Sequence, residues 1–262
     1  VASAQFNVLP PLRYVVARAT SAVVVDGVGD EYLYTSSMTF LLRTGRGIRD
    51  NTAVVRCLWD DQSLYVHYDV RDTQVNADVL SSTGSVWNDD NMELWIDPSH
   101  DRTGGTTDDR HLFVTVRNLQ RIINHTIPPG TLISSVTIIG TLNNNADEDT
   151  GYLIEAAIAW SLLGGSPTAN QSMGFDFCAT DKDLPSDGYL AYDWAGLTSF
   201  NQPALWGTVV FSTTPAEMTD NVPPTVVLTN PLDQSTYTAP ATVPLANRHP
   251  DDLTVPVLVG LV

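Results

Sequence analysis

Lysine, cysteine and long apolar runs are scarce or missing in this sequence. Lys182 is the only lysine, and 13 basic residues stand against 30 acidic ones, for a formal net charge of −17. A chain with this charge repels phosphate backbones and anionic lipid, so we expect neither nucleic acid nor membrane surfaces as partners. No segment has the ~20 consecutive apolar residues that a membrane-spanning helix needs. The composition favours a soluble extracellular protein with a neutral partner such as a glycan, or one that holds hard cations.

The two cysteines, Cys57 and Cys178, also limit what the chain can be. Two thiols make neither a disulfide scaffold nor a four-thiolate zinc site. Both lie in apolar, strand-like surroundings. They are therefore either two buried small side chains or one bridge between strands.

Signatures of catalysis and of nucleotide binding are absent. There is no G-x-S-x-G nucleophile elbow, no glycine-rich phosphate loop and no histidine pair at metalloprotease spacing. Carboxylates are plentiful, however, and a glycosidase needs only two of them at the right separation. A glycoside hydrolase that uses Glu93 with a distant partner such as Glu155 therefore stays open as an alternative.

Short segments of alternating apolar and polar residues, bounded by Gly, Asn, Asp and Pro, dominate the chain. The expected strands are residues 14–19, 52–59, 63–70, 91–97, 111–117, 135–141, 151–159, 173–179 and 207–212. The best helical candidate is one short turn at residues 159–163, which ends at Gly164 and Gly165. Many short strands and few helices predict an all-β protein, an antiparallel β-sandwich of the jelly-roll type.

The composition changes near residue 214, which divides the chain. We expect a β-sandwich over residues 1–214, a polar linker over 215–222, and a short unit over 223–262 that is an incomplete β-domain or a disordered tail. The first five residues have no basic or long apolar stretch and are typical of a mature N-terminus after removal of a secretion signal.

The segment with the most chemical information is V-W-N-D-D-N-M-E-L-W-I-D at residues 86–97. Within its strand, the apolar residues 92, 94 and 96 face the core, and the opposite face carries Glu93 and Trp95. Trp87 lies in the turn before the strand, at the edge of the sandwich. A flat aromatic ring beside a carboxylate suits a sugar, whose C–H face stacks on the ring while its hydroxyls donate to the oxygens.

Several stretches, in order, resemble the family 9 carbohydrate-binding modules and their DOMON-like relatives. The matching pieces are V-V-D-G at 24–27, W-D-D-Q-S-L-Y-V at 59–66, W-N-D-D-N-M-E-L-W-I-D at 87–97, E-A-A-I-A-W at 155–160 and N-Q-P-A-L-W-G at 201–207. The resemblance covers about residues 22–212. It implies a DOMON-like sandwich that binds a polysaccharide or oligosaccharide without catalysis, linked covalently to enzyme modules of a secreted bacterial protein.

The resemblance also implies roles for single residues. Trp87 and Glu93 would contact the sugar, and a second aromatic residue before the last strand would complete the site. That residue is Trp194, Phe200 or Trp206, of which we favour Trp194.

One departure from the family pattern concerns the strand after the central signature. The family carries an arginine there that points into the sugar site, and this chain has Phe113, with His111 on the same face. His111 and Asn201 are included among the expected ligand-binding residues.

The family further implies structural Ca²⁺ and no organic cofactor. The candidate calcium ligands are Asp72, Asp89, Asp90, Asp97 and Asp101. From about residue 223 the chain resembles the start of a bacterial Ig-like spacer. Two other functions stay open: a structural or adhesive domain without a small ligand, and a haem-binding DOMON-like domain that uses Met92 or Met38.

Overall fold

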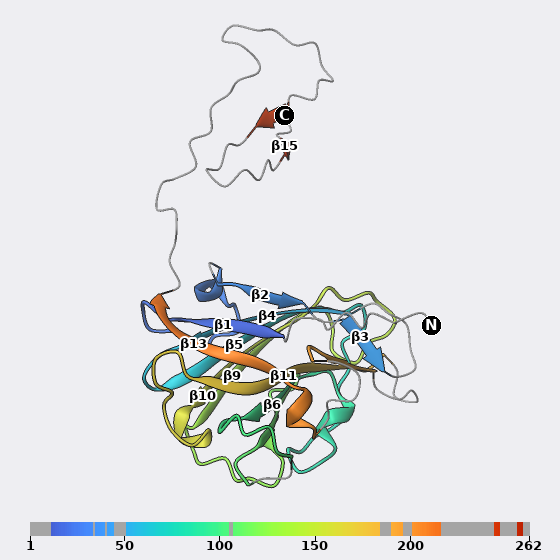
Figure 1. Cartoon of the computed structure of the whole chain (residues 1–262). Coiled ribbons are helices and arrows are strands. Elements are labelled where there is room, and N and C mark those ends of the chain that lie inside the picture. The colour runs from blue at the N-terminus through green and yellow to red at the C-terminus, as the bar shows by residue number, and fades with distance from the viewer. Residues whose placement is uncertain are drawn as a thin grey trace, which may run out of the picture. The chain divides into compact units, whose positions relative to one another are not determined.

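The computed structural model describes residues 12–33, 35–39, 41–44, 51–104, 107–183, 190–195, 201–215, 244–246 and 256–258. The chain divides into two compact units, Val1–Glu217 and Met218–Val262. The first unit is built of strands, and its helical segments within the described residues are short 3₁₀ turns (Figure 1). The expectation of an all-β sandwich is confirmed.

The strands of the first unit follow one another with few interruptions. In chain order they are β1 (Arg13–Arg18), β2 (Ser37–Thr39), β3 (Leu41–Thr44), β4 (Thr52–Trp59), β5 (Ser63–Arg71), β6 (Asn91–Asp97), β7 (Arg110–Thr115), β8 (Gln120–Ile122), β9 (Leu132–Ile139), β10 (Gly151–Ala159), β11 (Ser172–Asp181), β12 (Leu190–Asp193) and β13 (Gly207–Pro215). The 3₁₀ turns are η1 (Asp30–Tyr32), η2 (Val86–Asn88), η3 (Trp160–Leu162) and η4 (Pro203–Leu205).

The strands pair in the order β8-β7-β6-β11-β13-β1-β4-β5-β10-β9. Strand β1 connects the two halves of this order, because it pairs in parallel with β13 on one side and with β4 on the other. The remaining neighbours on this path are antiparallel, including β5 with β10 and β6 with β7. Folding the continuous sheet over at β1 places the two halves face to face as the layers of a sandwich.

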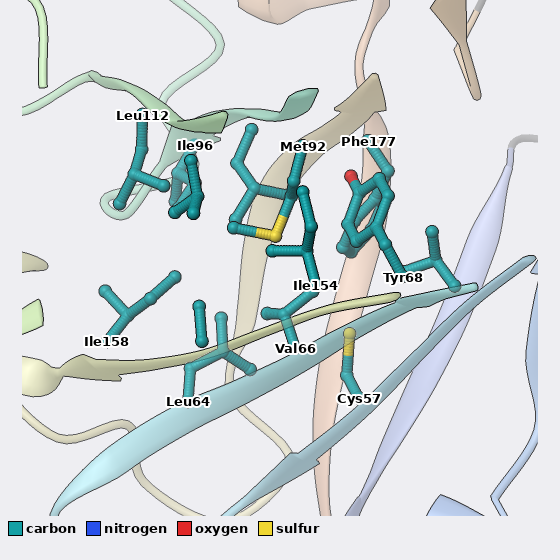
Figure 2. Packing of buried hydrophobic residues seen from close by; sticks show 14 of the residues in the cluster. Cys57, Leu64, Val66, Tyr68, Met92, Ile96, Leu112, Ile154, Ile158 and Phe177 are labelled. Atoms are coloured by element: carbon teal, nitrogen blue, oxygen red, sulfur yellow. The ribbon is translucent and has the colours of Figure 1, made fainter. Parts of the chain in front are cut away.

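The core lies between these layers and follows the period of two in the strands. Leu64, Val66 and Tyr68 of β5 face Met92 and neighbouring side chains of the opposite layer (Figure 2). The Tyr68 hydroxyl donates to the main-chain oxygen of Glu93 across the core, at 3.1 Å. The inward face of β6 is thereby fixed, and its other face is available for the candidate site.

The sequence predicted most of these strands, and β4, β6 and β10 have the expected bounds. The four strands that were not predicted, β2, β3, β8 and β12, have only three or four residues each, too few to show an alternating pattern. The expected short turn after β10 is η3.

Both cysteines are free and buried. Cys57 belongs to the core, whereas Cys178 lies in register with Glu93 on β6, so the two thiols face different sides of their sheets. Of the two interpretations of the cysteines, the buried small side chain is correct.

No helix within the described residues combines the length and the apolar character that crossing a membrane requires. In the second unit the described residues form β14 (Pro244–Ala246) and β15 (Pro256–Leu258), an antiparallel pair. Most of the segment from residue 223 onward, which resembles the start of an Ig-like spacer, lies outside the described residues, so an Ig-like fold for this unit stays a prediction.

Candidate functional site

Two neighbouring hollows lie on the side of β6 and β7 that faces away from the core. The first, which we call the Trp87 hollow, has a volume of about 370 Å³ and includes Trp87, Glu93, Phe113 and Arg121 in its lining. The second, the Trp206 hollow, has a volume of about 550 Å³. Its lining includes Trp206, and both volumes fall within the range of small-ligand sites.

Glu93 is held in one orientation by two donors. Trp95 Nε1 donates to Glu93 Oε1 at 2.8 Å, and His111 Nε2 lies 2.6 Å from the same oxygen. Glu93 is 4% exposed, so these bonds are shielded from water. Among the described residues none donates to Oε2. The second oxygen of Glu93 is therefore a fixed acceptor with no donor of its own.

The register of the sheet brings these groups together. Trp95 of β6 lies opposite His111 of β7, and Glu93 lies opposite Phe113. Residues that share a face of two paired strands are direct neighbours, so Trp95 and His111 stack, with ring centroids 3.4 Å apart and 19° between their planes. This stack lines both hollows.

Trp87 is positioned from η2, just before β6 begins. The Arg121 guanidinium lies over its ring, 5.3 Å from the centroid, and Phe113 packs beside it at 6.4 Å. Arg121 also donates to the main-chain oxygen of Gly84, three residues before Trp87. Arg121 thus fixes both the indole and the segment that carries it.

The expected ligand-binding residues are only partly brought together. Trp87, Glu93 and His111 line the Trp87 hollow, and Asn201 lines the Trp206 hollow. Phe200 lies outside the described residues. Two residues that the sequence did not single out, Arg121 and Ile123, line the Trp87 hollow, because the short strand β8 places them opposite β7.

Trp194, the favoured second aromatic residue, is partly buried against the core and lines neither hollow. Its amide donates to the Phe177 oxygen at 2.9 Å, and its ring packs edge-on against Phe177 with the core. A side chain at Gly207 would collide with the Trp194 ring, because a Cβ there would lie 2.3 Å from it. Trp206, another of the three candidates, lines a hollow but is only 3% exposed.

The geometry does not favour the catalytic alternative. Glycoside hydrolysis needs a pair of carboxylates, and among the described residues the Trp87 hollow has only Glu93, while Asp109 lines the adjoining Trp206 hollow. Glu155 accepts from the amides of Asp26 and Gly27 and lines neither hollow. Met92, the haem-ligand candidate with a described side chain, is fully buried in the core.

Three buried carboxylates converge at one end of the sandwich. Asp72 follows β5, Asp90 precedes β6 and Asp181 ends β11, and one oxygen from each lies within 4.8 Å of the others. Burial raises the pKa of the Asp90 carboxyl, and the neighbouring charges of Asp72 and Asp181 raise it further. Hard oxygen donors gathered in this way suit a cation such as Ca²⁺.

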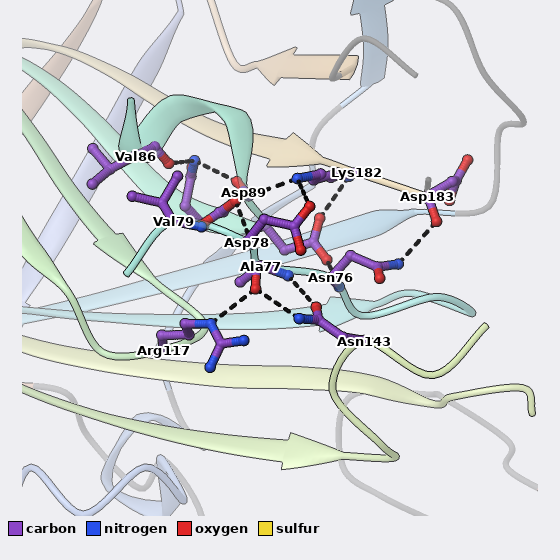
Figure 3. A network of polar contacts seen from close by, with 12 residues as sticks. Asn76, Ala77, Asp78, Val79, Val86, Asp89, Arg117, Asn143, Lys182 and Asp183 are labelled. Carbon is purple, nitrogen blue, oxygen red and sulfur yellow. Dashed lines mark hydrogen bonds and ion pairs between the residues drawn. The ribbon is translucent and has the colours of Figure 1, made fainter. Parts of the chain in front are cut away.

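A hydrogen-bond network beside this cluster accounts for Asp89 and for the single lysine (Figure 3). Asp89 accepts from the amides of Asp78 and Val79 at 2.9 and 3.0 Å, and Lys182 Nζ lies 3.6 Å from it. The same Nζ donates to Asp78 at 2.7 Å. Asp89 is thus an anchor for the segment that precedes η2.

The remaining expected calcium ligands are not brought together with the cluster. Asp97 accepts from Ser99 Oγ and from the amides of Asp101 and Arg102, which closes the turn after β6. Asp101 is exposed and caps the next turn through the Thr103 amide. Asp181 was missed, although the alternation of β11 places residue 181 on the core face and could have pointed to it.

Comparison with known proteins agrees with the fold. Over 190 residues, 71% of this chain, the sequence is 28% identical to endo-1,4-beta-xylanase A of Thermotoga maritima. Over 136 residues it is 30% identical to exoglucanase XynX of Acetivibrio thermocellus. The chain spans only a small part of these relatives, 16% of the first and 11% of the second.

Among solved structures, a family 9 carbohydrate-binding module from Caldicellulosiruptor kristjanssonii in complex with glucose is similar, with a TM-score of 0.61 and 21% identity. The match covers 79% of this chain and all of that one. The complex of such a module with cellotriose also has a TM-score of 0.61, at 23% identity. Residues 25–214 match the family described as "Carbohydrate family 9 binding domain-like". The chain therefore belongs to the carbohydrate family 9 binding domain-like family, which is a family of binding modules and not of enzymes.

Proposed function

We propose that the first unit binds β-1,4-linked glycans of the cellulose and xylan type, as an accessory module of a secreted bacterial carbohydrate-active enzyme. The observation that carries this is the pairing of the Trp87 ring with the fixed Glu93 carboxylate in one hollow. A pyranose stacked on the indole would place its hydroxyls toward Glu93 Oε2, a charge-assisted acceptor. The xylanase and exoglucanase relatives, and the sugars held by the similar solved structures, support this class of ligand and a covalently linked enzyme.

The test is retention of the purified chain on cellulose, xylan, β-glucan, mannan and chitin, with wild type beside Trp87→Ala. Retention on cellulose or xylan that Trp87→Ala abolishes is the expected result. Leu80→Ala is the matched control, because it shortens an apolar side chain that is 79% exposed and lines neither hollow. Retention that Trp87→Ala leaves intact, or no retention on any of the five, contradicts the proposal.

We also propose that Asp72, Asp90 and Asp181 hold a structural Ca²⁺. Three carboxylates this close and this buried repel one another, and a divalent cation would remove that cost. The Asn51 amide group supports the fit, because it lies against Asp72 at 3.4 Å and its buried oxygen has no hydrogen-bond partner among the described residues. The ion would tie the ends of β5 and β11 to the start of β6, the strand that carries Glu93.

A further inference from the structure

A row of aromatic rings runs from the Trp87 hollow into the Trp206 hollow. From Trp87 the ring centroids are 6.4 Å to Phe113, 4.3 Å on to His111, 3.4 Å on to Trp95 and 5.8 Å on to Trp206. Its middle members, Trp95 and His111, belong to the linings of both hollows, as does Ile123. The two hollows are therefore adjoining parts of one surface.

The Trp206 hollow has the chemical character that a sugar needs. Half-buried Trp95 provides apolar surface, and the largely buried Trp206 packs beside it. The amides of Asn124 and Asn201 provide both donors and acceptors at the rim. Both asparagines are exposed and have left-handed backbones, with φ of 59° and 55°. A neutral amide on a tight turn suits an uncharged polyhydroxylated ligand better than an ion.

Two charged side chains line this hollow, Asp109 and Arg110, and the guanidinium is already engaged by the main chain. Arg110 Nη1 lies against the main-chain oxygens of Thr107, Asp108 and Asp109, and Nε donates to that of Leu162 at 2.7 Å. Its guanidinium therefore serves the local backbone and does not attract an anionic ligand. The groups that would recognise an occupant are therefore the rings, the amides and the Asp109 carboxylate.

We propose that the Trp206 hollow is a further sugar subsite, so that the module recognises a run of several linked sugar units and not a single terminal residue. The proposal rests on the proposed function, because the occupant is the continuation of the glycan held at Trp87. A glycan with one sugar unit beside Trp87 would pass over the Trp95–His111 stack. Its later units would then lie against Trp206, Asn124 and Asn201. Its affinity then rises with chain length until both hollows are filled.

The experiment compares monosaccharides with tetrasaccharides, glucose with cellotetraose and xylose with xylotetraose, by NMR titration of the full chain. The variant that tests the subsite is the double substitution Asn124→Gly, Asn201→Gly, since glycine keeps the left-handed backbone while removing the amides. Asn170→Gly is the matched control, an exposed asparagine with φ of 62° that lines neither hollow. Trp87→Ala reports on the first hollow.

Wild type and Asn170→Gly are expected to bind the tetrasaccharide at least about tenfold more tightly than the monosaccharide. In the double variant the affinity for the monosaccharide stays unchanged, and the tetrasaccharide no longer binds more tightly than the monosaccharide. The Trp206 indole resonance shifts with tetrasaccharide and not with monosaccharide.

The subsite is contradicted if wild type binds the monosaccharide and the tetrasaccharide with equal affinity. It is also contradicted if the double variant still binds the tetrasaccharide more tightly than the monosaccharide. In either case, loss of binding in Trp87→Ala leaves the proposed function standing. If no saccharide binds, or if Trp87→Ala binds as wild type does, the proposed function fails and the subsite fails with it.

Discussion

Tyr32 stacks on His67, with ring centroids 5.3 Å apart and 25° between the ring planes. Tyr32 comes from η1 and covers the outer face of β5, where His67 is 4% exposed. Neither ring nitrogen of His67 has a hydrogen-bond partner among the described residues. Burial lowers the pKa of His67 to about 4, because the charged imidazolium would lose its hydration there.

This histidine predicts a loss of stability in mild acid. Its pKa in the folded protein is below the ordinary value of about 6.5, so the unfolded chain takes up the proton first, and the stability present above pH 6.5 is lost as the pH falls toward 4. Between pH 8 and pH 5 the contribution is roughly 2 kcal/mol. Urea unfolding at pH 8 and pH 5 measures this. The free energy of unfolding should fall less in His67→Gln than in wild type, by about this amount. An equal fall in both proteins would show that another group titrates.

Glu93→Gln should weaken sugar binding without unfolding the domain. The glutamine oxygen can still accept from Trp95 and His111, but an amide NH₂ replaces the free carboxylate oxygen. Loss of a charged acceptor is expected to lower the affinity roughly ten- to a hundredfold. Calorimetric titration with a cello- or xylo-oligosaccharide measures this, with Glu31→Gln as the control for a glutamate that lines neither hollow. Unchanged affinity in Glu93→Gln would remove Glu93 from the site.

Arg121→Met should act on the site through Trp87. Methionine retains an apolar stem but loses the cation over the indole and the donor to the Gly84 oxygen. The expected result is roughly a three- to thirtyfold weaker affinity. Partial recovery is expected in Arg121→Lys, which restores the charge without the planar group. Arg71→Met, at an exposed position outside both hollows, should bind as wild type does.

Calcium should raise the melting temperature, and more at pH 8 than at pH 5. The pKa of Asp90 is raised, so the folded protein favours the protonated carboxyl and loses stability as the pH rises; Ca²⁺ competes with that proton and offsets the loss. Asp181→Asn removes one of three like charges. It should stabilise the metal-free form and reduce the rise in melting temperature that calcium causes. Differential scanning fluorimetry in EDTA and in excess Ca²⁺ tests this, with the exposed Asp30→Asn as control. An increment that is the same in both variants would contradict the metal site.

The sequence could predict those features of the site that follow from alternation along one strand. The period of β6 places Met92 in the core and Glu93 on the opposite face, and the structure agrees. The resemblance to a known family supplied the role of Trp87. The fold class followed from strand spacing alone.

The part that depends on pairing between distant segments could not be predicted. Arg121 reaches Trp87 because a three-residue strand pairs with β7, and such a strand is too short for a periodic signal. Trp194 packs against the core beside Phe177, to whose main-chain oxygen its amide donates, and the local sequence does not indicate this contact. The alternation of β11 indicates that Asp181 faces the core, but its proximity to Asp72 and Asp90 depends on the ends of β5 and β11 meeting the start of β6.

The parallel pairing of β1 with β13 has a mechanical consequence. Arg13 lies opposite Thr208 and Arg18 lies toward Pro215, so the chain enters this strand pair at one end and leaves it at the other. Tension applied along the polypeptide therefore pulls the two strands past each other lengthwise and loads their hydrogen bonds together instead of one by one. A domain pulled between its two chain ends would therefore resist unravelling at the strand pair where the force enters.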